Sequence, residues 1–199
     1  MRQYKEIASK PYCCVPAVLE SILLRHGYKF DQVDIANYFG LTVPTDEMDS
    51  LSGTFTKLNA SDEVSMIGIH LGKDGFNSFF ADNGISLSET FVSASELSEL
   101  NIDSVLDAIP EDSDAVFFFD YGVLYGEDRN KGVGHNGAFV LREGEYVSYW
   151  DPGPRRMGVN KVKIDDLLCA MKAAYSGGGI SVISGLLASD SNENINISN

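Results

Sequence analysis

Cys14 is the first residue of the sequence whose type and position could do chemistry. It comes directly before a predicted helix that begins near Val15 and Pro16, where a proline suits the first helical turn and apolar residues then recur at helical spacing. A thiol at a helix N-terminus lies close to unpaired N–H groups and to the positive end of the helix dipole, which stabilise a thiolate. The same N–H groups could receive an oxyanion during acyl transfer. The motif alone fits a buried structural cysteine equally well.

His135 is the histidine best placed to act as a base. It stands in the run GVGHNG at the mouth of a predicted strand, where flanking glycines leave the imidazole accessible to a facing helix N-terminus. His26 ends the first predicted helix, where a hydrogen-bond donor or a positive charge interacts favourably with the last backbone carbonyls. His70 has no acidic or hydroxyl neighbour at a spacing that would indicate a catalytic pair. We therefore expect His26 and His70 to be structural.

Asp151 is predicted to orient His135. It follows a predicted strand over 146–150, which a short loop joins to a strand over 137–142. Because the start of one hairpin strand lies beside the end of the other, Asp151 is expected across the ladder from His135, within reach of a ring nitrogen. A plain Asp-Pro-Gly-Pro turn explains the same residues without any catalytic role.

The remaining cysteines are predicted to have no catalytic role. Cys13 precedes the helix by one more residue, so its side chain should point elsewhere, and Cys169 is expected inside a late amphipathic helix, in the core. Three cysteines without a spaced framework indicate free thiols in a reducing compartment. Adjacent cysteines lack the spacer typical of zinc sites, so we predict no metal and no cofactor.

The order of the predicted elements indicates an α+β fold, with N-terminal helices packed on a C-terminal antiparallel sheet. The chain has the length of one domain, predicted over 1–187, and its polar end over 188–199 is predicted to be a disordered tail. Residues 41–60 are predicted to form a long loop. Helices are expected over 15–26, 31–39, 74–83, 95–109 and 164–174, and strands over 115–119, 137–142, 146–150 and 179–184.

The charge balance restricts the partners. The 199 residues include 29 acidic and 15 basic side chains, for a formal net charge of −14. Such a field repels nucleic acid and anionic membranes and favours a cationic partner, although a surplus of acid usually serves solubility. No apolar stretch has the length of a signal peptide or a membrane span. We therefore expect a cytoplasmic protein with no nucleic-acid partner and no integral membrane segment.

Three short motifs resemble the bacteriocin double-glycine leader peptidase family, a bacterial group of papain-like cysteine peptidases. Cys-Val-Pro-Ala at the start of the first helix is similar to the Cys-Gly-Pro-Ala of that family, and the second predicted helix is also similar. Gly134-His135 before an apolar strand and a strand ending in Asp151-Pro152 complete the pattern. Order and approximate spacing agree over about 140 residues. The resemblance implies a papain-like fold, with Cys14 as nucleophile, His135 as general base and acid, and Asp151 as the orienting group.

One feature of the family is missing. Papain-like enzymes place a glutamine several residues before the cysteine, where its amide completes the oxyanion hole, whereas residues 6–12 here contain no glutamine and Gln3 is eleven residues upstream of Cys14. Losing one oxyanion donor typically costs about 10²–10³ in rate. Either the oxyanion site uses Cys14 and Tyr12, with Ser9 and Lys10 as further candidates, or the chemistry is not efficient peptide cleavage.

These features predict a cysteine hydrolase that cleaves a peptide or isopeptide bond through a Cys-His-Asp triad and an acyl-enzyme. The resemblance implies a peptide or protein substrate and association with an export system. Two alternatives stay open. One is an acyltransferase that uses the same triad, and the other is a catalytically idle module that binds peptides.

Overall fold

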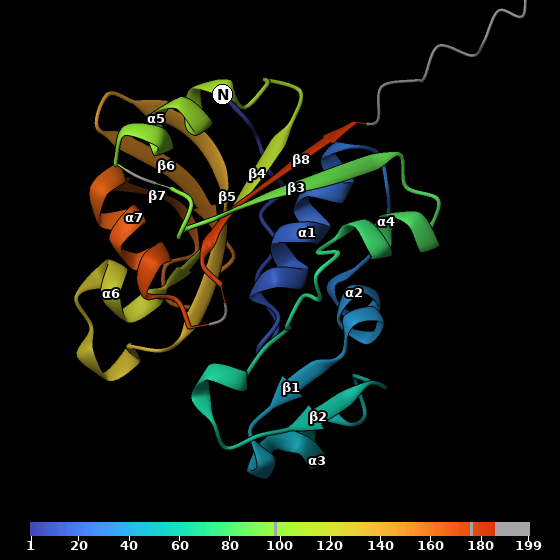
Figure 1. The fold of residues 1–199 in the computed structure, drawn as a ribbon. Helices are drawn as coiled ribbons and strands as arrows, with labels where there is room; N and C mark the ends of the chain where they lie inside the picture. Colours follow the sequence, from blue (N-terminus) through green and yellow to red (C-terminus); the bar gives the residue numbers. More distant parts are fainter. Residues whose placement is uncertain (98, 176, 186–199) are drawn as a thin grey trace, which may run out of the picture.

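The computed structural model describes residues 1–97, 99–175 and 177–185, so the predicted tail over 188–199 lies outside the described residues. Its centre is a six-stranded antiparallel sheet with the order β3-β8-β4-β5-β6-β7 (Figure 1). The α+β arrangement predicted from the sequence is confirmed. The strands are β3 (Leu87–Ser93), β4 (Asp114–Asp120), β5 (Gly134–Glu143), β6 (Tyr146–Asp151), β7 (Gly158–Lys163) and β8 (Gly179–Gly185).

Helices cover both faces of the sheet because its central strands are apolar on both sides. Along β4, Val116 belongs to the core shared with the first helix, whereas Phe117 belongs to the core on the opposite face, as the two-residue period of a strand requires. The first face carries α1 (Cys14–Arg25), α2 (Gln32–Phe39) and α4 (Asn77–Asp82), and the second carries α5 (Glu99–Ala108), α6 (Tyr121–Tyr125) and α7 (Ile164–Ala173) (Figure 1).

The predicted loop over 41–60 is wrong, because it contains regular structure. Two three-residue strands, β1 (Leu41–Val43) and β2 (Leu58–Ala60), pair in parallel, and a third core cluster that includes Cys13 and Phe55 lies beneath them. Strands this short carry too little alternation to be seen in a sequence. The segment also holds a 3₁₀ turn, η1 (Thr45–Glu47), and a one-turn helix, α3 (Met48–Leu51).

Several further elements were absent from the prediction. The sheet strands β3 and β7, the short helix α6 and two 3₁₀ turns, η2 (Val64–Met66) and η3 (Asp128–Asn130), were not expected. The strand β7 is an edge strand whose residues alternate between half-buried and exposed, so it lacks the apolar content that marks a central strand.

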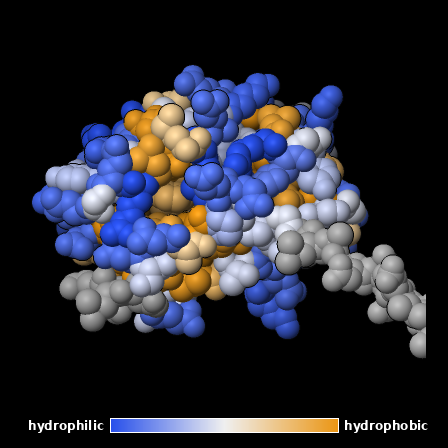
Figure 2. Space-filling view, turned by 90° about the horizontal axis from the view of Figure 1, so that it is seen from above, coloured by the Kyte–Doolittle hydropathy of each residue, from blue (hydrophilic) through white to orange (hydrophobic). Residues whose placement is uncertain are grey.

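The view in Figure 2 shows a largely hydrophilic face with hydrophobic side chains gathered in patches. Among the described residues, no helix is long and apolar enough to cross a membrane.

Candidate active site

His135 and Asp151 meet at the end of the β5–β6 hairpin. The His135 Nε2 donates to the Asp151 Oδ1 over 3.0 Å, and the Gly153 N–H donates to the same oxygen over 2.7 Å. Asp151 is fully buried, and the His135 side chain is only 9% exposed. A buried carboxylate held this way fixes the orientation and the tautomer of the imidazole.

The register of the hairpin differs by two residues from the direct pairing of His135 with Asp151 that the sequence predicted. Ala138 pairs with Trp150, so continuing the register places Gly137 opposite Asp151. His135 therefore reaches the carboxylate diagonally along the same face of the sheet. Because β5 carries one extra residue between Phe139 and Leu141, Gly137 and not Ala138 stands opposite Asp151, and this places His135 on the same face as the carboxylate.

The helix α1 begins at Cys14, one residue earlier than the sequence predicted, and the Cys14 thiol is half-buried. Burial acts to lower the pKa of His135, but the hydrogen bond and charge of Asp151, together with the influence of Cys14, raise that pKa to about 9. Because Nε2 is bonded to Asp151, Nδ1 is the ring nitrogen left for the thiol. No Cys14–His135 hydrogen bond meets normal distance and angle limits within the described residues, and such contacts often tighten only when substrate binds.

Two aromatic rings enclose the imidazole edge-on. The Phe119 ring centroid lies 5.6 Å from that of His135 with an interplanar angle of 77°, and the Tyr121 centroid lies at 5.4 Å and 88°. Phe119 is the direct partner of His135 across β4 and β5, and Tyr121 begins α6 immediately after β4. This packing holds the ring in one position and limits its contact with water.

Asn136 joins α1 to the sheet and was missed by the sequence analysis. In the amide orientation that satisfies both groups, Nδ2 donates to the Cys14 carbonyl over 3.1 Å and Oδ1 accepts from the Val15 N–H over 3.2 Å. Asn136 is fully buried and lies next to His135 in β5, with its side chain on the opposite face of the strand. One strand thus carries both the proposed base and the anchor of the helix that presents Cys14. The position of an asparagine directly after the histidine was the only signal for it in the sequence.

The first turn of α1 leaves one backbone donor for an oxyanion. The Val15 N–H is taken by Asn136, Pro16 has no N–H, and the Ala17 N–H donates to the Cys13 carbonyl over 2.9 Å. No hydrogen bond of the described residues uses the Cys14 N–H. This N–H is therefore the best-placed donor next to the thiol.

Tyr12, Ser9 and Gln3, which were also considered for the oxyanion site, have other surroundings. Burial and the neighbouring carboxylate of Glu47 raise the pKa of Tyr12 to about 12. The Ser9 hydroxyl donates to the Lys10 carbonyl. Gln3 is exposed on the N-terminal segment, which runs beside the far part of β5. The role assigned to Tyr12 stays a prediction, with less support than that of the Cys14 N–H.

The remaining thiols lie in contrasting environments. Cys13 is fully buried in the cluster beneath β1 and β2, and burial raises its pKa to about 12, so it is an inert core thiol. The core position predicted for Cys169 is wrong, because this side chain is exposed on α7. It occupies a position on the outer face of the helix, between the buried residues Leu168 and Ala170.

The other two histidines make structural contacts. The His26 Nε2 lies 2.7 Å from the buried Asp114 Oδ2 at the end of α1, and the His70 Nε2 lies 2.8 Å from the Met66 carbonyl oxygen. Within the described ranges, no group of three or more His, Cys, Asp or Glu side chains could hold a metal ion.

Comparisons with known proteins identify no relative by sequence: no family model and no curated protein matches the chain. Among solved structures, the peptidase domain of Streptococcus ComA, a bifunctional ABC transporter involved in quorum sensing, is 13% identical; the match covers 92% of this chain and 99% of that domain, with a TM-score of 0.49. The Legionella pneumophila protein LPG0564 is 13% identical over 63% of this chain and 46% of its own, with a TM-score of 0.30. Likenesses at this level assign neither a family nor an activity to the chain.

Proposed function

We propose that this chain is a papain-like thiol hydrolase that cleaves a peptide or isopeptide bond with Cys14, His135 and Asp151. The observation that carries the proposal is the buried His135–Asp151 hydrogen bond of 3.0 Å beside a cysteine at the first position of a helix. A thiol at a helix N-terminus next to an imidazole with a raised pKa favours a thiolate–imidazolium pair.

The first half of the reaction forms an acyl-enzyme. The Cys14 thiol gives its proton to the His135 Nδ1, and the thiolate sulfur attacks the substrate carbonyl carbon. The carbonyl oxygen becomes an oxyanion that accepts a hydrogen bond from the Cys14 N–H. The C–N bond then breaks, His135 gives its proton to the leaving amine, and the acyl group stays on Cys14 as a thioester.

The second half restores the thiol. Neutral His135 takes a proton from a water molecule as the water oxygen attacks the thioester carbon. When the C–S bond breaks, the proton held by His135 returns to sulfur and the carboxylic acid leaves. Throughout the cycle Asp151 accepts the Nε2 hydrogen bond and stabilises the imidazolium each time it forms.

The two alternatives use parts of the same site. An acyltransferase would form the same thioester and pass the acyl group to an amine or an alcohol in place of water. An idle peptide-binding module would need neither a base beside the thiol nor a buried carboxylate to orient that base. The buried His135–Asp151 pair therefore favours the two acyl-transfer chemistries over the binding module.

The substrate and partner are inferred from the sequence motifs. These resemble the double-glycine leader peptidases, so we propose a peptide or protein substrate and association with an export system. The ComA domain, which belongs to a bifunctional ABC transporter, is an example of such an arrangement. Cleavage of leader peptides and co-purification with a transporter are separate tests of these two points.

The test of the proposal is the rate of iodoacetamide modification of Cys14 as a function of pH, followed by mass spectrometry. We expect the wild-type rate to reach its plateau near neutral pH and the midpoint to move upward in His135→Ala, because the imidazolium that stabilises the thiolate is gone. The midpoint of an ordinary thiol, near pH 8.5, in both proteins would contradict the proposal.

Cys169 supplies an internal control for the same experiment. It is an exposed thiol on α7, so iodoacetamide can reach it, and its modification rate reports a thiol outside the proposed triad. A thiol-directed acylating probe used briefly at neutral pH should label Cys169→Ala about as fast as the wild type, and should label Cys14→Ala much more slowly. Equal labelling of Cys14→Ala and Cys169→Ala would remove the case for a special Cys14.

A further inference from the structure

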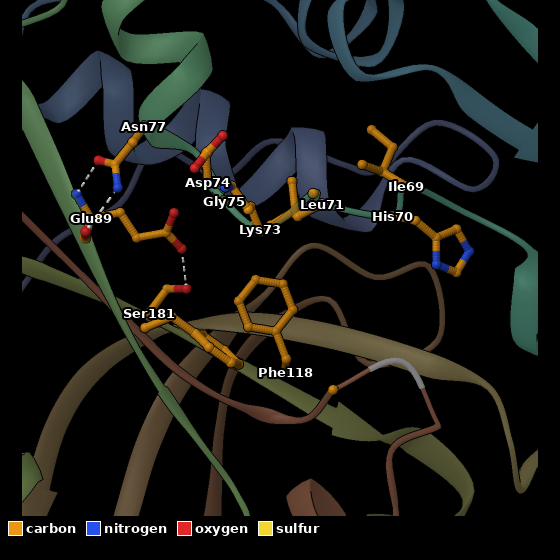
Figure 3. A pocket seen from close by; sticks show the side chains of 13 residues that line it. Ile69, His70, Leu71, Lys73, Asp74, Gly75, Asn77, Glu89, Phe118 and Ser181 are labelled. Carbon is orange, nitrogen blue, oxygen red and sulfur yellow. Dashed lines mark hydrogen bonds between the residues drawn. The ribbon is translucent and has the colours of Figure 1, made fainter.

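A pocket of about 550 Å³ opens on the face of the sheet that carries α1 (Figure 3). Its walls come from the segment before α4 and from the strands β3, β4 and β8. Figure 3 shows the carboxylate of Glu89 with Ser181, Asn77 and Asp74 at one end of the pocket, His70 at the other end, and the Phe118 ring between them. The pocket thus has a polar end and an apolar middle.

The pocket lies beside the Cys14 site, although Cys14 itself does not line it. Phe118 pairs with Asn136 across β4 and β5, and the Asn136 amide binds the Cys14 carbonyl. Ile69 in the wall packs against the same core cluster as Cys14. A Cβ on Gly68, the residue before it, would lie 4.0 Å from the carbonyl oxygen of Tyr12. A chain bound at Cys14 therefore has a side pocket within reach.

Glu89 is the chemically distinctive residue of the pocket. Its residue surface is only 9% exposed, and its carboxylate accepts hydrogen bonds from the Ser181 hydroxyl and the Phe76 N–H, one on each oxygen. A carboxylate has about four acceptor positions, so each oxygen keeps one for a ligand. Gly75 leaves the space that the Glu89 carboxylate occupies, because a Cβ at position 75 would overlap that carboxylate.

Glu89 has no cationic partner among the ion pairs of the described residues. Acidic side chains are almost never this buried unless they are paired. Burial raises the pKa of Glu89, although the hydrogen bonds from Ser181 and Phe76 oppose that rise. A bound cation would supply the missing charge partner. Asp74 adds a second carboxylate at the rim, against the single ammonium of Lys73.

We propose that this pocket binds a substrate side chain that has an aliphatic stem and a cationic head, as lysine and arginine do, with Glu89 receiving the head. The stem would pack on Phe118 and Leu71, and the head would take the free acceptor positions of Glu89. The net charge of −14 favours approach of such a substrate. The inference deepens the proposed function, because the pocket is assigned to part of the peptide that Cys14 attacks.

Glu89→Gln is the variant that separates charge from structure. The backbone of Glu89 also fixes the start of α4: the Asn77 Nδ2 donates to the Glu89 carbonyl, and the Glu89 N–H donates to the Asn77 Oδ1. A glutamine at position 89 leaves these backbone contacts unchanged. Its side chain can also replace those of the carboxylate, because Oε1 can accept from the Phe76 N–H and Nε2 can donate to the Ser181 hydroxyl. Asp166→Asn is the matched control, because it removes the same charge from an exposed position on α7, behind the opposite face of the sheet.

The experiment measures the second-order rate of Cys14 modification by tetrapeptide acyloxymethyl ketones. Lysine, norleucine or glutamate is placed in turn at each of the four positions, with alanine at the others. At one position we expect lysine to exceed norleucine by about tenfold or more, the effect of one charge-assisted hydrogen bond. Glu89→Gln should abolish this preference and Asp166→Asn should keep it. No preference at any position, or a preference that survives in Glu89→Gln, would overturn the inference.

A binding measurement distinguishes failure of this inference from failure of the proposed function. In Cys14→Ala, titration with N-acetyl-lysine methylamide is followed by NMR and compared with the norleucine analogue. Shifts near Glu89 and Ser181 with the lysine compound alone support the pocket, even where no ketone reacts with Cys14 and the hydrolase proposal fails. Equal or absent shifts with both compounds overturn the pocket, even where Cys14 proves reactive.

Discussion

His135 reaches Asp151 diagonally across the β5–β6 hairpin, over the residue directly opposite the carboxylate, and that residue is Gly137. A Cβ at Gly137 would overlap the Tyr149 ring and lie 2.8 Å from the Trp150 carbonyl oxygen. The absence of a side chain there lets the two strands and the Tyr149 ring pack closely beneath the pair. The hydrogen bond of the proposed triad therefore depends on a glycine as well as on its two partners.

Asp151→Asn should lower kcat/KM by about 10²–10⁴, because an amide neither fixes the productive tautomer nor stabilises the imidazolium. The titration of the His135 ring, followed by NMR, should move to lower pH, since the hydrogen bond and charge of Asp151 support its raised pKa. The asparagine can still accept the Gly153 N–H, so the fold should persist. An unchanged His135 titration in a folded Asp151→Asn protein would contradict the role assigned to Asp151.

The raised pKa of His135 also predicts how stability depends on pH. The pKa rises from 6.5 to about 9 on folding, so the folded protein binds this proton more tightly than the unfolded chain. The stabilisation is fully present below pH 6.5 and is lost as the pH rises through about 9. At about 1.4 kcal/mol per pKa unit, the shift bounds the loss at about 3 kcal/mol. Urea unfolding at pH 6, 8 and 10 should show this fall in the wild type and a smaller fall in His135→Gln.

The sequence predicted the parts of the fold and site that follow from local chemistry. Pro16 after Cys14 marked the start of α1, and the hairpin spacing brought Asp151 close to His135. The irregularity near Val140, which sets the diagonal contact, depends on packing between strands and leaves no local pattern. Asn136 was missed for a related reason, since its partners on α1 are more than 100 positions away in the chain. Cys169 was misplaced because an apolar run in a helix does not reveal which residue faces outward.

Asp114→Asn should destabilise the fold while leaving the Cys14 site intact. Asp114 is fully buried and accepts hydrogen bonds of 2.7 Å from Tyr4, Arg25 and His26. Disrupting a buried ionic contact of this kind costs about 3–5 kcal/mol. Arg25 ends α1 about 16 Å from Cys14, at 1.5 Å per residue. The midpoint of Cys14 alkylation against pH should therefore match the wild type, and a clear shift would show that the two ends of α1 are coupled.

Asn136→Ala should impair both the stability and the reactivity of Cys14. The change leaves the Cys14 carbonyl and the Val15 N–H without their buried partner, which should lower the free energy of unfolding by about 1–3 kcal/mol. Without these two hydrogen bonds the start of α1 is no longer held in place on β5, so the thiol moves relative to His135. We expect kcat to fall more than KM rises, with the alkylation midpoint shifted to higher pH.

Stability alone does not explain that outcome, because Asp114→Asn supplies a variant destabilised at least as much at the other end of the same helix. Asn136→Asp refines the test: its carboxylate accepts from the Val15 N–H but cannot donate to the Cys14 carbonyl, so it should recover only part of the lost reactivity. If Asn136→Ala and Asp114→Asn gave the same alkylation midpoint, Asn136 would be an ordinary core residue. A shift in Asn136→Ala alone would make it a positioning residue that acts on the thiol through the backbone of α1.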